Sequence, residues 1–318
     1  MGQAALDRSP RAGYALAVAA AAMWGLNGSL ARLLLDAGLA PLRLAQMRSA
    51  IAFAILLAFL ALTRPALLRV RPGDLPRLAF LGVCGLALVH AAYFLAIDRL
   101  QIGVALVIQY LGPLLVLLWL RVAHGRRLPR ALWGAAALSL VGCFFVVRAW
   151  DLGALDALGL LAALGSAVTF AVYLYASEQA GQRYRPATTL VYAFGFATVF
   201  WAVVEPPWTF PYAALGGPDT LALALGVAVV GTLLPFACIV AALRHVPASR
   251  AAVVATLEPV LAALIAWALL GQVLDPAQIA GGLLVVAAVV WVQSRRPALE
   301  AEAAPAIGAR RALRGAVD

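Results

Sequence analysis

One carboxylate lies deep inside a long apolar stretch of this sequence. Glu258 directly precedes Pro259 within Ala251–Leu270, a run of almost entirely apolar residues. Charged groups are costly in hydrocarbon, and they usually face a cavity or a partner there. The functional interpretation is a contact to a substrate amine, or a proton-coupling group. The structural alternative is a carboxylate that bonds free backbone amides or a neighbouring Arg and so stabilises a helix break.

Other polar residues interrupt other apolar stretches. Asn27, His90 and Gln109 lie at comparable depths if these stretches are membrane helices, and Tyr110 follows Gln109 directly. We expect them to share one level of a cavity, since buried polar groups in lipid need a cavity or a partner. The alternative for each is a satisfied hydrogen bond between helices. Arg48, in the second stretch, is expected to pair with a headgroup or a helix end.

Aromatic residues accompany these polar positions and are expected to wall a pocket. Many aromatic residues of membrane proteins form belts at the water interface. Trp24, Tyr110 and Phe170 lie too deep in their stretches for a belt, so a cavity or core position is expected for them. Tyr175 is also placed where it could wall a pocket, and the aromatic site candidates are Trp24, Tyr93, Tyr110, Phe170 and Tyr173.

Three prolines fall in the middle of apolar stretches. A proline inside a helix removes a backbone hydrogen bond and loosens the helix. In transporters such breaks often line the substrate site. We therefore predict hinges or cavity walls at Pro113, Pro235 and Pro259, with a kink that serves only packing as the alternative.

The remaining chemistry-bearing residues indicate neither an enzyme nor a metalloprotein. Cys84, Cys143 and Cys238 each lie in an apolar run, and their spacing fits no zinc pattern. No nucleophile–base pair or phosphate-binding loop is recognisable. The sequence therefore predicts no catalytic residue, no metal site and no cofactor.

The composition requires lipid as the solvent for much of the surface. Hydrophobic residues make up 64% of the 318 residues, charged residues only 12%, and the mean hydropathy is +0.95. A soluble domain carries about twice that charged fraction. The net charge of +10 does not predict nucleic-acid binding, because the arginines lie in short loops between apolar runs.

Ten apolar runs are long enough to cross a bilayer as helices, which need roughly 20 residues each. The first continues too far to be a cleaved signal segment. The runs are Tyr14–Leu35, Leu44–Leu62, Leu78–Ile97, Gly103–Leu120, Ala131–Val147, Ala157–Tyr175, Thr189–Val204, Leu221–Leu243, Ala251–Leu270 and Gln278–Gln293.

The loop charges predict the orientation of these spans. All 24 basic residues are Arg, and most fall in the termini and in alternate loops. Cytoplasmic loops carry an excess of basic residues, so both termini are predicted to be cytoplasmic. The arginines that do not follow this pattern are Arg32, Arg43, Arg48, Arg99 and Arg148.

The chain contains an internal repeat. Ala96–Ala131 aligns without gaps with Ala242–Ala277, and this alignment matches Pro113 with Pro259. Each half holds five spans, an odd number, so the two halves must be inverted relative to each other. Inverted repeats are the usual basis of alternating access, in which a central site opens to each side in turn. Gene duplication without transport, as in a membrane enzyme or a sensor, is the alternative.

Short motifs resemble the drug/metabolite transporter superfamily, EamA family. These are Trp24-Gly25-Leu26-Asn27, the run Ala105–Pro113 and its partner Ala251–Pro259. The resemblance implies an all-α membrane protein of ten helices, built as two inverted five-helix repeats. It also implies that spans 1, 3, 4, 6, 8 and 9 line a central cavity, with spans 2, 5, 7 and 10 outside. Gly271-Gln272 departs from the usual Gly-Glu of the family, so a carboxylate role there is in doubt.

The same resemblance implies secondary transport across the inner membrane, commonly export of amino acids or similar metabolites. Efflux of drugs or of other metabolites is the alternative within transport. The expected partners are a small-molecule substrate, the lipid bilayer and a coupling proton. The predicted organisation is a cytoplasmic N-terminus (1–13), two repeats (14–148 and 157–293) and a disordered cytoplasmic tail (294–318).

Overall fold

The protein is a bundle of helices, and its structure is a computed structural model that describes residues 9–100, 102–125, 128–150, 156–270 and 273–294. Within these residues there is no β-strand. Eight helical spans are long and apolar enough to cross a membrane, and Arg130–Val146 and Pro276–Val292 are shorter apolar helices. The predicted tail and the Gly271-Gln272 pair lie outside the described residues.

The first half of the chain contains eight segments that together make five crossings. The predicted third and fourth spans are each divided, whereas the other three are single helices. The segments are α1 (Pro10–Asp36), α2 (Pro41–Thr63), α3 (Leu75–Phe80), a π-helical stretch (Leu81–Ala87), α4 (Leu88–Arg99), α5 (Ile102–Gln109), α6 (Gly112–Val122) and α7 (Arg130–Val146).

The second half repeats this arrangement. Its third and fourth crossings are also divided, at positions that correspond to those in the first half. The segments are α8 (Ala157–Gly181), α9 (Pro186–Val204), α10 (Pro218–Ala228), a π-helical stretch (Val229–Leu233), α11 (Leu234–Ala242), α12 (Ala248–Ala255), α13 (Glu258–Leu270) and α14 (Pro276–Ser294). Short 3₁₀ turns at Pro65–Leu68, Pro72–Asp74, Pro207–Thr209 and Tyr212–Leu215 complete the loops.

The matched prolines explain the two helix breaks. A proline cannot donate to the carbonyl four residues earlier, and its ring collides with that carbonyl. For Pro113 that carbonyl belongs to Gln109, where α5 ends. For Pro259 it belongs to Ala255, where α12 ends. The same local physics therefore ends a helix at equivalent positions in both repeats.

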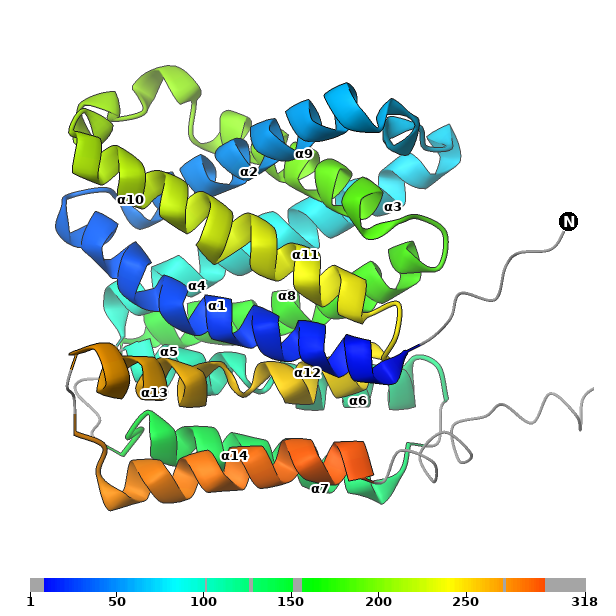
Figure 1. Cartoon of the computed structure of the whole chain (residues 1–318), viewed down its shortest axis with the longest axis vertical. Coiled ribbons are helices and arrows are strands. Elements are labelled where there is room, and N and C mark those ends of the chain that lie inside the picture. The colour runs from blue at the N-terminus through cyan, green and yellow to red at the C-terminus, as the bar shows by residue number, and fades with distance from the viewer. Residues whose placement is uncertain (1–8, 101, 126–127, 151–155, 271–272, 295–318) are drawn as a thin grey trace, which may run out of the picture.

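The helices run roughly side by side, and Figure 1 shows α7 and α14 at one end of the long axis and α2, α9 and α10 at the other. α1 lies between them and packs on α11, α12 and α13. The start of α1 and the end of α14 lie on the same face of the molecule (Figure 1). We call this the terminal face, and the side where α1 ends at Asp36 the opposite face.

Both outer groups are fastened by specific contacts. On the opposite face, Arg43 of α2 pairs with Glu205 at the end of α9, at 2.7 Å. At the other end, α7 and α14 approach so closely that a Cβ at Gly281 would lie 2.6 Å from the Gly142 carbonyl oxygen. Lipid provides no hydrophobic driving force between helices, so association depends on close packing. Small residues at such crossings let the two backbones approach closely.

This crossing yields a stability prediction. Gly281→Ala places a methyl group against the α7 backbone, and overpacking of this kind typically costs about 1–3 kcal/mol. We expect a lower melting temperature for the detergent-solubilised protein. Gly226→Ala is the matched control, because a Cβ at Gly226 would have no atom of the described chain within 4 Å. An unchanged melting temperature for Gly281→Ala would contradict the described crossing.

Candidate functional site

A cavity of about 70 Å³ lies among the helices in the middle of the molecule. A buried water needs roughly 10–15 Å³ on this measure, so the cavity has room for a few waters. Eight of the nine cavity candidates chosen from the sequence line it, and Tyr173 does not. The lining residues are Trp24, Asn27, Gly28, Arg48, Val89, His90, Tyr93, Gln109, Tyr110, Phe170, Phe236 and Glu258.

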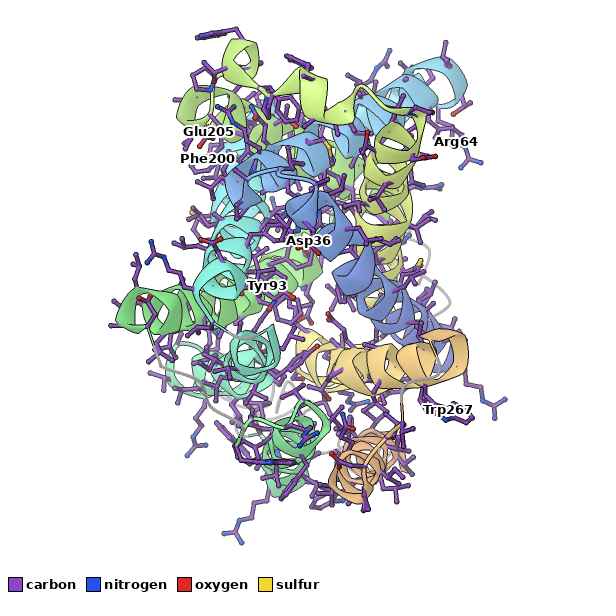
Figure 2. All side chains as sticks on the ribbon, turned by 90° about the vertical axis from the view of Figure 1, so that its left-hand side faces the viewer. Asp36, Arg64, Tyr93, Phe200, Glu205 and Trp267 are labelled. Atoms are coloured by element: carbon purple, nitrogen blue, oxygen red, sulfur yellow. The ribbon has the colours of Figure 1, made fainter. Side chains whose placement is uncertain are left out.

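The lining residues come from both repeats. Trp24 and Asn27 lie on α1, and His90 and Tyr93 on α4. In the view onto the opposite face, Tyr93 lies on the side of α4 that looks across the middle of the molecule toward α1 and α13 (Figure 2). Phe170 comes from α8. The cavity is therefore formed by segments that are far apart in the sequence.

The two helix breaks also reach the cavity. Gln109 and Tyr110 stand where α5 ends, and Glu258 is the first residue of α13. Pro113 and Pro259 follow within the next turn and are not lining residues themselves. The prolines thus determine where the backbone breaks, and the residues before them provide the polar side chains.

Phe236 organises the aromatic wall, although sequence reasoning did not select it. Its ring makes edge contacts with Trp24, His90 and Tyr173, at centroid distances of 5.3, 5.4 and 5.2 Å. Tyr173 is fully buried and packs behind this ring, which is why it supports the wall without reaching the cavity. Phe236 follows Pro235 directly, and that adjacency was the only signal in the sequence.

Arg48 corrects the expected position of the second span. The resemblance implied that this span lies outside the cavity, yet Arg48 of α2 is 3% exposed and lines it. Its burial also excludes pairing with a headgroup. Its Nε donates to the Thr232 hydroxyl at 2.7 Å and its Nη2 to the Gly231 carbonyl at 2.8 Å. The guanidinium also lies over the Phe94 ring, at 5.5 Å from its centre.

Pro235 explains why that carbonyl accepts an arginine. Gly231 lies four residues before Pro235, so the usual helical donor to its carbonyl is missing. The π-helical stretch that precedes Pro235 opens the helix at the same point, as such stretches often do at functional sites. The proline predicted from the sequence as a hinge or wall thus leaves an acceptor for the buried cation.

The guanidinium keeps donors for another partner. An arginine has five N–H donors, and within the described residues Arg48 directs only the two just mentioned to protein acceptors. In the part of the chain that the structure describes, no carboxylate lies within ion-pair distance of Arg48. A buried cation of this kind can receive a carboxylate in a fork geometry.

Glu258 supplies the opposite charge. Its carboxyl group lines the same cavity as the Tyr110 hydroxyl and the Arg48 guanidinium. Across the described residues, no backbone amide donates to it and no Arg forms a direct ion pair with it. The structural alternative drawn from the sequence, a carboxylate tied to amides or to a neighbouring Arg, is therefore not the arrangement found.

Three other lining residues carry buried polar atoms that lack a partner. Asn27 Oδ1, His90 Nδ1 and Gln109 Oε1 are buried without a hydrogen-bond partner in the described chain. Buried polar atoms are normally satisfied by protein, water or ligand, and each exception needs an explanation. Because all three residues line the cavity, a polar occupant is the explanation that fits their position.

A glycine preserves the room for Asn27. A Cβ at Gly231 would collide with the Asn27 side chain. Gly231 therefore contributes twice to the site: it gives its carbonyl to Arg48, and its missing side chain leaves space for Asn27.

Comparisons with known proteins agree with this architecture. The Escherichia coli (strain K12) threonine/homoserine exporter RhtA is 29% identical over 73% of this chain and 75% of its own length. The Pseudomonas aeruginosa pseudopaline exporter CntI is 28% identical over 75% of this chain and 82% of its own length. A solved crystal structure with 20% identity covers 91% of this chain and 99% of its own, with a TM-score of 0.73, and supports the fold.

The family follows from a direct match. The sequence profile described as the EamA-like transporter family matches residues 11–148 and 157–293, one match in each half of the chain. This excludes the enzyme and sensor readings that the sequence left open. The chain is a multi-pass membrane transporter and belongs to the EamA-like transporter family.

Proposed function

We propose that this protein exports small amino acids, or closely related zwitterions, across the inner membrane. The observation that carries this proposal is the presence of two oppositely charged residue types in one small cavity, with Arg48 and Glu258 both in its lining. A free amino acid carries a carboxylate and an ammonium group. A site with a buried cation and a buried anion matches both ends of such a molecule.

The substrate carboxylate binds the free donors of Arg48, and its ammonium group binds Glu258. Asn27, His90 and Gln109 then meet the polar part of the substrate side chain. The names of related proteins support this class, because RhtA is described as a threonine/homoserine exporter. A hydroxyl group, as in those two amino acids, is a suitable partner for the unpaired amide oxygens of Asn27 and Gln109.

Export is coupled to a proton that occupies Glu258 when the substrate does not. Glu258 is the only acidic residue among the described residues that line the cavity. Either a proton or an ammonium group neutralises it, because a buried carboxylate that stays charged without a partner carries a large desolvation cost. Such competition for one carboxylate makes exchange of substrate for proton obligatory.

The helix breaks before Pro113 and Pro259 act as hinges. The cavity of about 70 Å³ holds a few waters and is narrow for an amino acid, so binding requires it to widen. Both breaks occur where α5 meets α6 and α12 meets α13, next to Tyr110 and Glu258. Equivalent hinges in two inverted repeats give the symmetric motion that alternating access needs.

The terminal face is the cytoplasmic one. Among the described residues, the loops and helix ends on that face carry most of the arginines, as the positive-inside rule requires. The start of α1 and the end of α14 share this face (Figure 1), in agreement with an even number of crossings.

The transport proposal is tested by counterflow in liposomes loaded with unlabelled threonine and supplied with labelled threonine or other amino acids. Arg48→Gln removes the guanidinium that is proposed to bind the carboxylate of the substrate. Hydrogen bonds to charged groups contribute about 1.5–3 kcal/mol, so we expect a rate at least about tenfold lower at subsaturating substrate. Arg64→Gln, an exposed residue after α2, is the control. If no amino acid exchanges above empty vesicles, the proposed substrate class is wrong.

Proton coupling is tested with an imposed pH gradient. An acidic interior should drive labelled substrate into liposomes that hold the unchanged protein, because protons leave as substrate enters. Glu258→Gln cannot bind and release a proton, so accumulation should no longer respond to the gradient, whereas Glu258→Asp should retain a response. Full gradient-driven accumulation by Glu258→Gln would show that the proton uses another path.

The hinge proposal is tested with Pro113→Ala and Pro259→Ala. Restoring an N–H at either position lets the helix continue through the break. We expect each variant to lower the transport rate more than the yield of folded protein. Pro218→Ala, at the first turn of α10 where proline has no such effect, is the control. Equal losses of rate and yield would indicate a packing role only.

A further inference from the structure

An apolar groove of about 460 Å³ lies on the outside of the bundle, between α3, α6 and α8. It is separate from the central cavity, with which it shares no lining residue. Several of its large side chains are about half exposed, including Phe80, Trp119 and Val168. Its position on membrane-spanning helices means that lipid, and not water, surrounds it.

The groove continues into a second hollow of about 550 Å³ toward the terminal face, with charged residues in its lining. Phe80 and Tyr175 line both, so the two are contiguous. The lining of the hollow includes Arg77, Gln179 and Arg183. An apolar slot that opens onto a cationic end has the same polarity as a phospholipid, which has an acyl chain joined to a headgroup.

The hollow has a surplus of positive charge. One Asp74 oxygen accepts from both Arg77, at 3.1 Å, and Arg183, at 2.7 Å. The other oxygen accepts from the Tyr184 hydroxyl at 2.8 Å. The Asp74 side chain is 8% exposed, whereas those of Arg77 and Arg183 are 70% and 54% exposed. The carboxylate is thus enclosed by its partners, while two guanidiniums keep donors that face outward.

Aromatic residues at the junction of the groove and the hollow indicate that this junction lies at the membrane–water interface. The Tyr175 hydroxyl and His124 Nε2 are 2.7 Å apart, and Trp119 makes edge contacts with both rings. Amphipathic aromatics of this kind gather at the depth of lipid headgroups. The groove therefore runs from headgroup depth into the hydrocarbon, as an acyl chain does.

We propose that this surface binds one anionic phospholipid, with an acyl chain in the groove and its phosphate against Arg77 and Arg183. Arginine suits this role, because its planar fork matches phosphate oxygens and its charge persists at the membrane. The preference for an anionic lipid follows from the balance of two cations and one enclosed carboxylate. A zwitterionic headgroup offers the phosphate but brings its own cation to an already cationic hollow.

The test uses the purified full-length transporter, titrated with phosphatidylglycerol or phosphatidylcholine of identical acyl chains, with bound lipid counted by native mass spectrometry. Surface arginines contribute about fivefold each to anionic-lipid binding. We therefore expect phosphatidylglycerol to bind at least fivefold more tightly than phosphatidylcholine. Equal binding of the two lipids would overturn the proposal.

Two sets of variants distinguish the contribution of the lipid headgroup to binding from that of the acyl chain. Arg77→Gln leaves the Arg183–Asp74 contact in place and should reduce binding of phosphatidylglycerol about fivefold, with phosphatidylcholine unchanged. Arg77→Gln/Arg183→Gln should remove the preference. Val168→Trp fills the groove and should weaken both lipids, whereas Leu164→Trp, one turn earlier on α8 and outside the groove, should not. Unaltered binding by Arg77→Gln, or by Val168→Trp, contradicts the assigned site.

Discussion

Lipid gives a backbone no hydrogen-bond partner, and this constraint determines where the chain can be irregular. A non-helical backbone at membrane depth is tolerated only inside protein or beside a polar cavity. In this protein both helix breaks, after Gln109 and after Ala255, lie next to the central cavity. Polar side chains that would be costly against lipid collect at the same place. The candidate site and the helix breaks therefore lie at the same place in the fold.

Arg48 illustrates how one irregularity supports another. Its charge is tolerable inside the bundle because the Gly231 carbonyl and the Thr232 hydroxyl accept from it. That carbonyl lacks its usual helical donor because Pro235 has no N–H. The same glycine leaves room for Asn27. The free Gly231 carbonyl of the second repeat thereby holds the Arg48 side chain of the first repeat. This contact keeps the guanidinium in the cavity.

Much of the fold could be predicted before any coordinates, because long apolar runs have few stable forms in lipid. The ten spans follow from length and hydropathy, and the matched Pro113 and Pro259 indicated both the repeat and its breaks. The candidates around these breaks were also found from sequence, since polar and deep aromatic residues in apolar runs are rare. Phe236 was not found in this way, because a phenylalanine in an apolar run does not stand out, and its position next to Pro235 was its only signal.

The sequence by itself determined the membrane class, the repeat and the polar residues that the bilayer would force inward. Tertiary structure alone decided which helix faces meet. The ends of an apolar run indicate how deep each of its residues lies in the membrane, but not how the helix is rotated about its own axis. That rotation depends on contacts with neighbouring residues such as Gly231 and Thr232. That is why Arg48 was expected outside and lies in the cavity, and why Tyr173 was expected in the wall and packs behind Phe236.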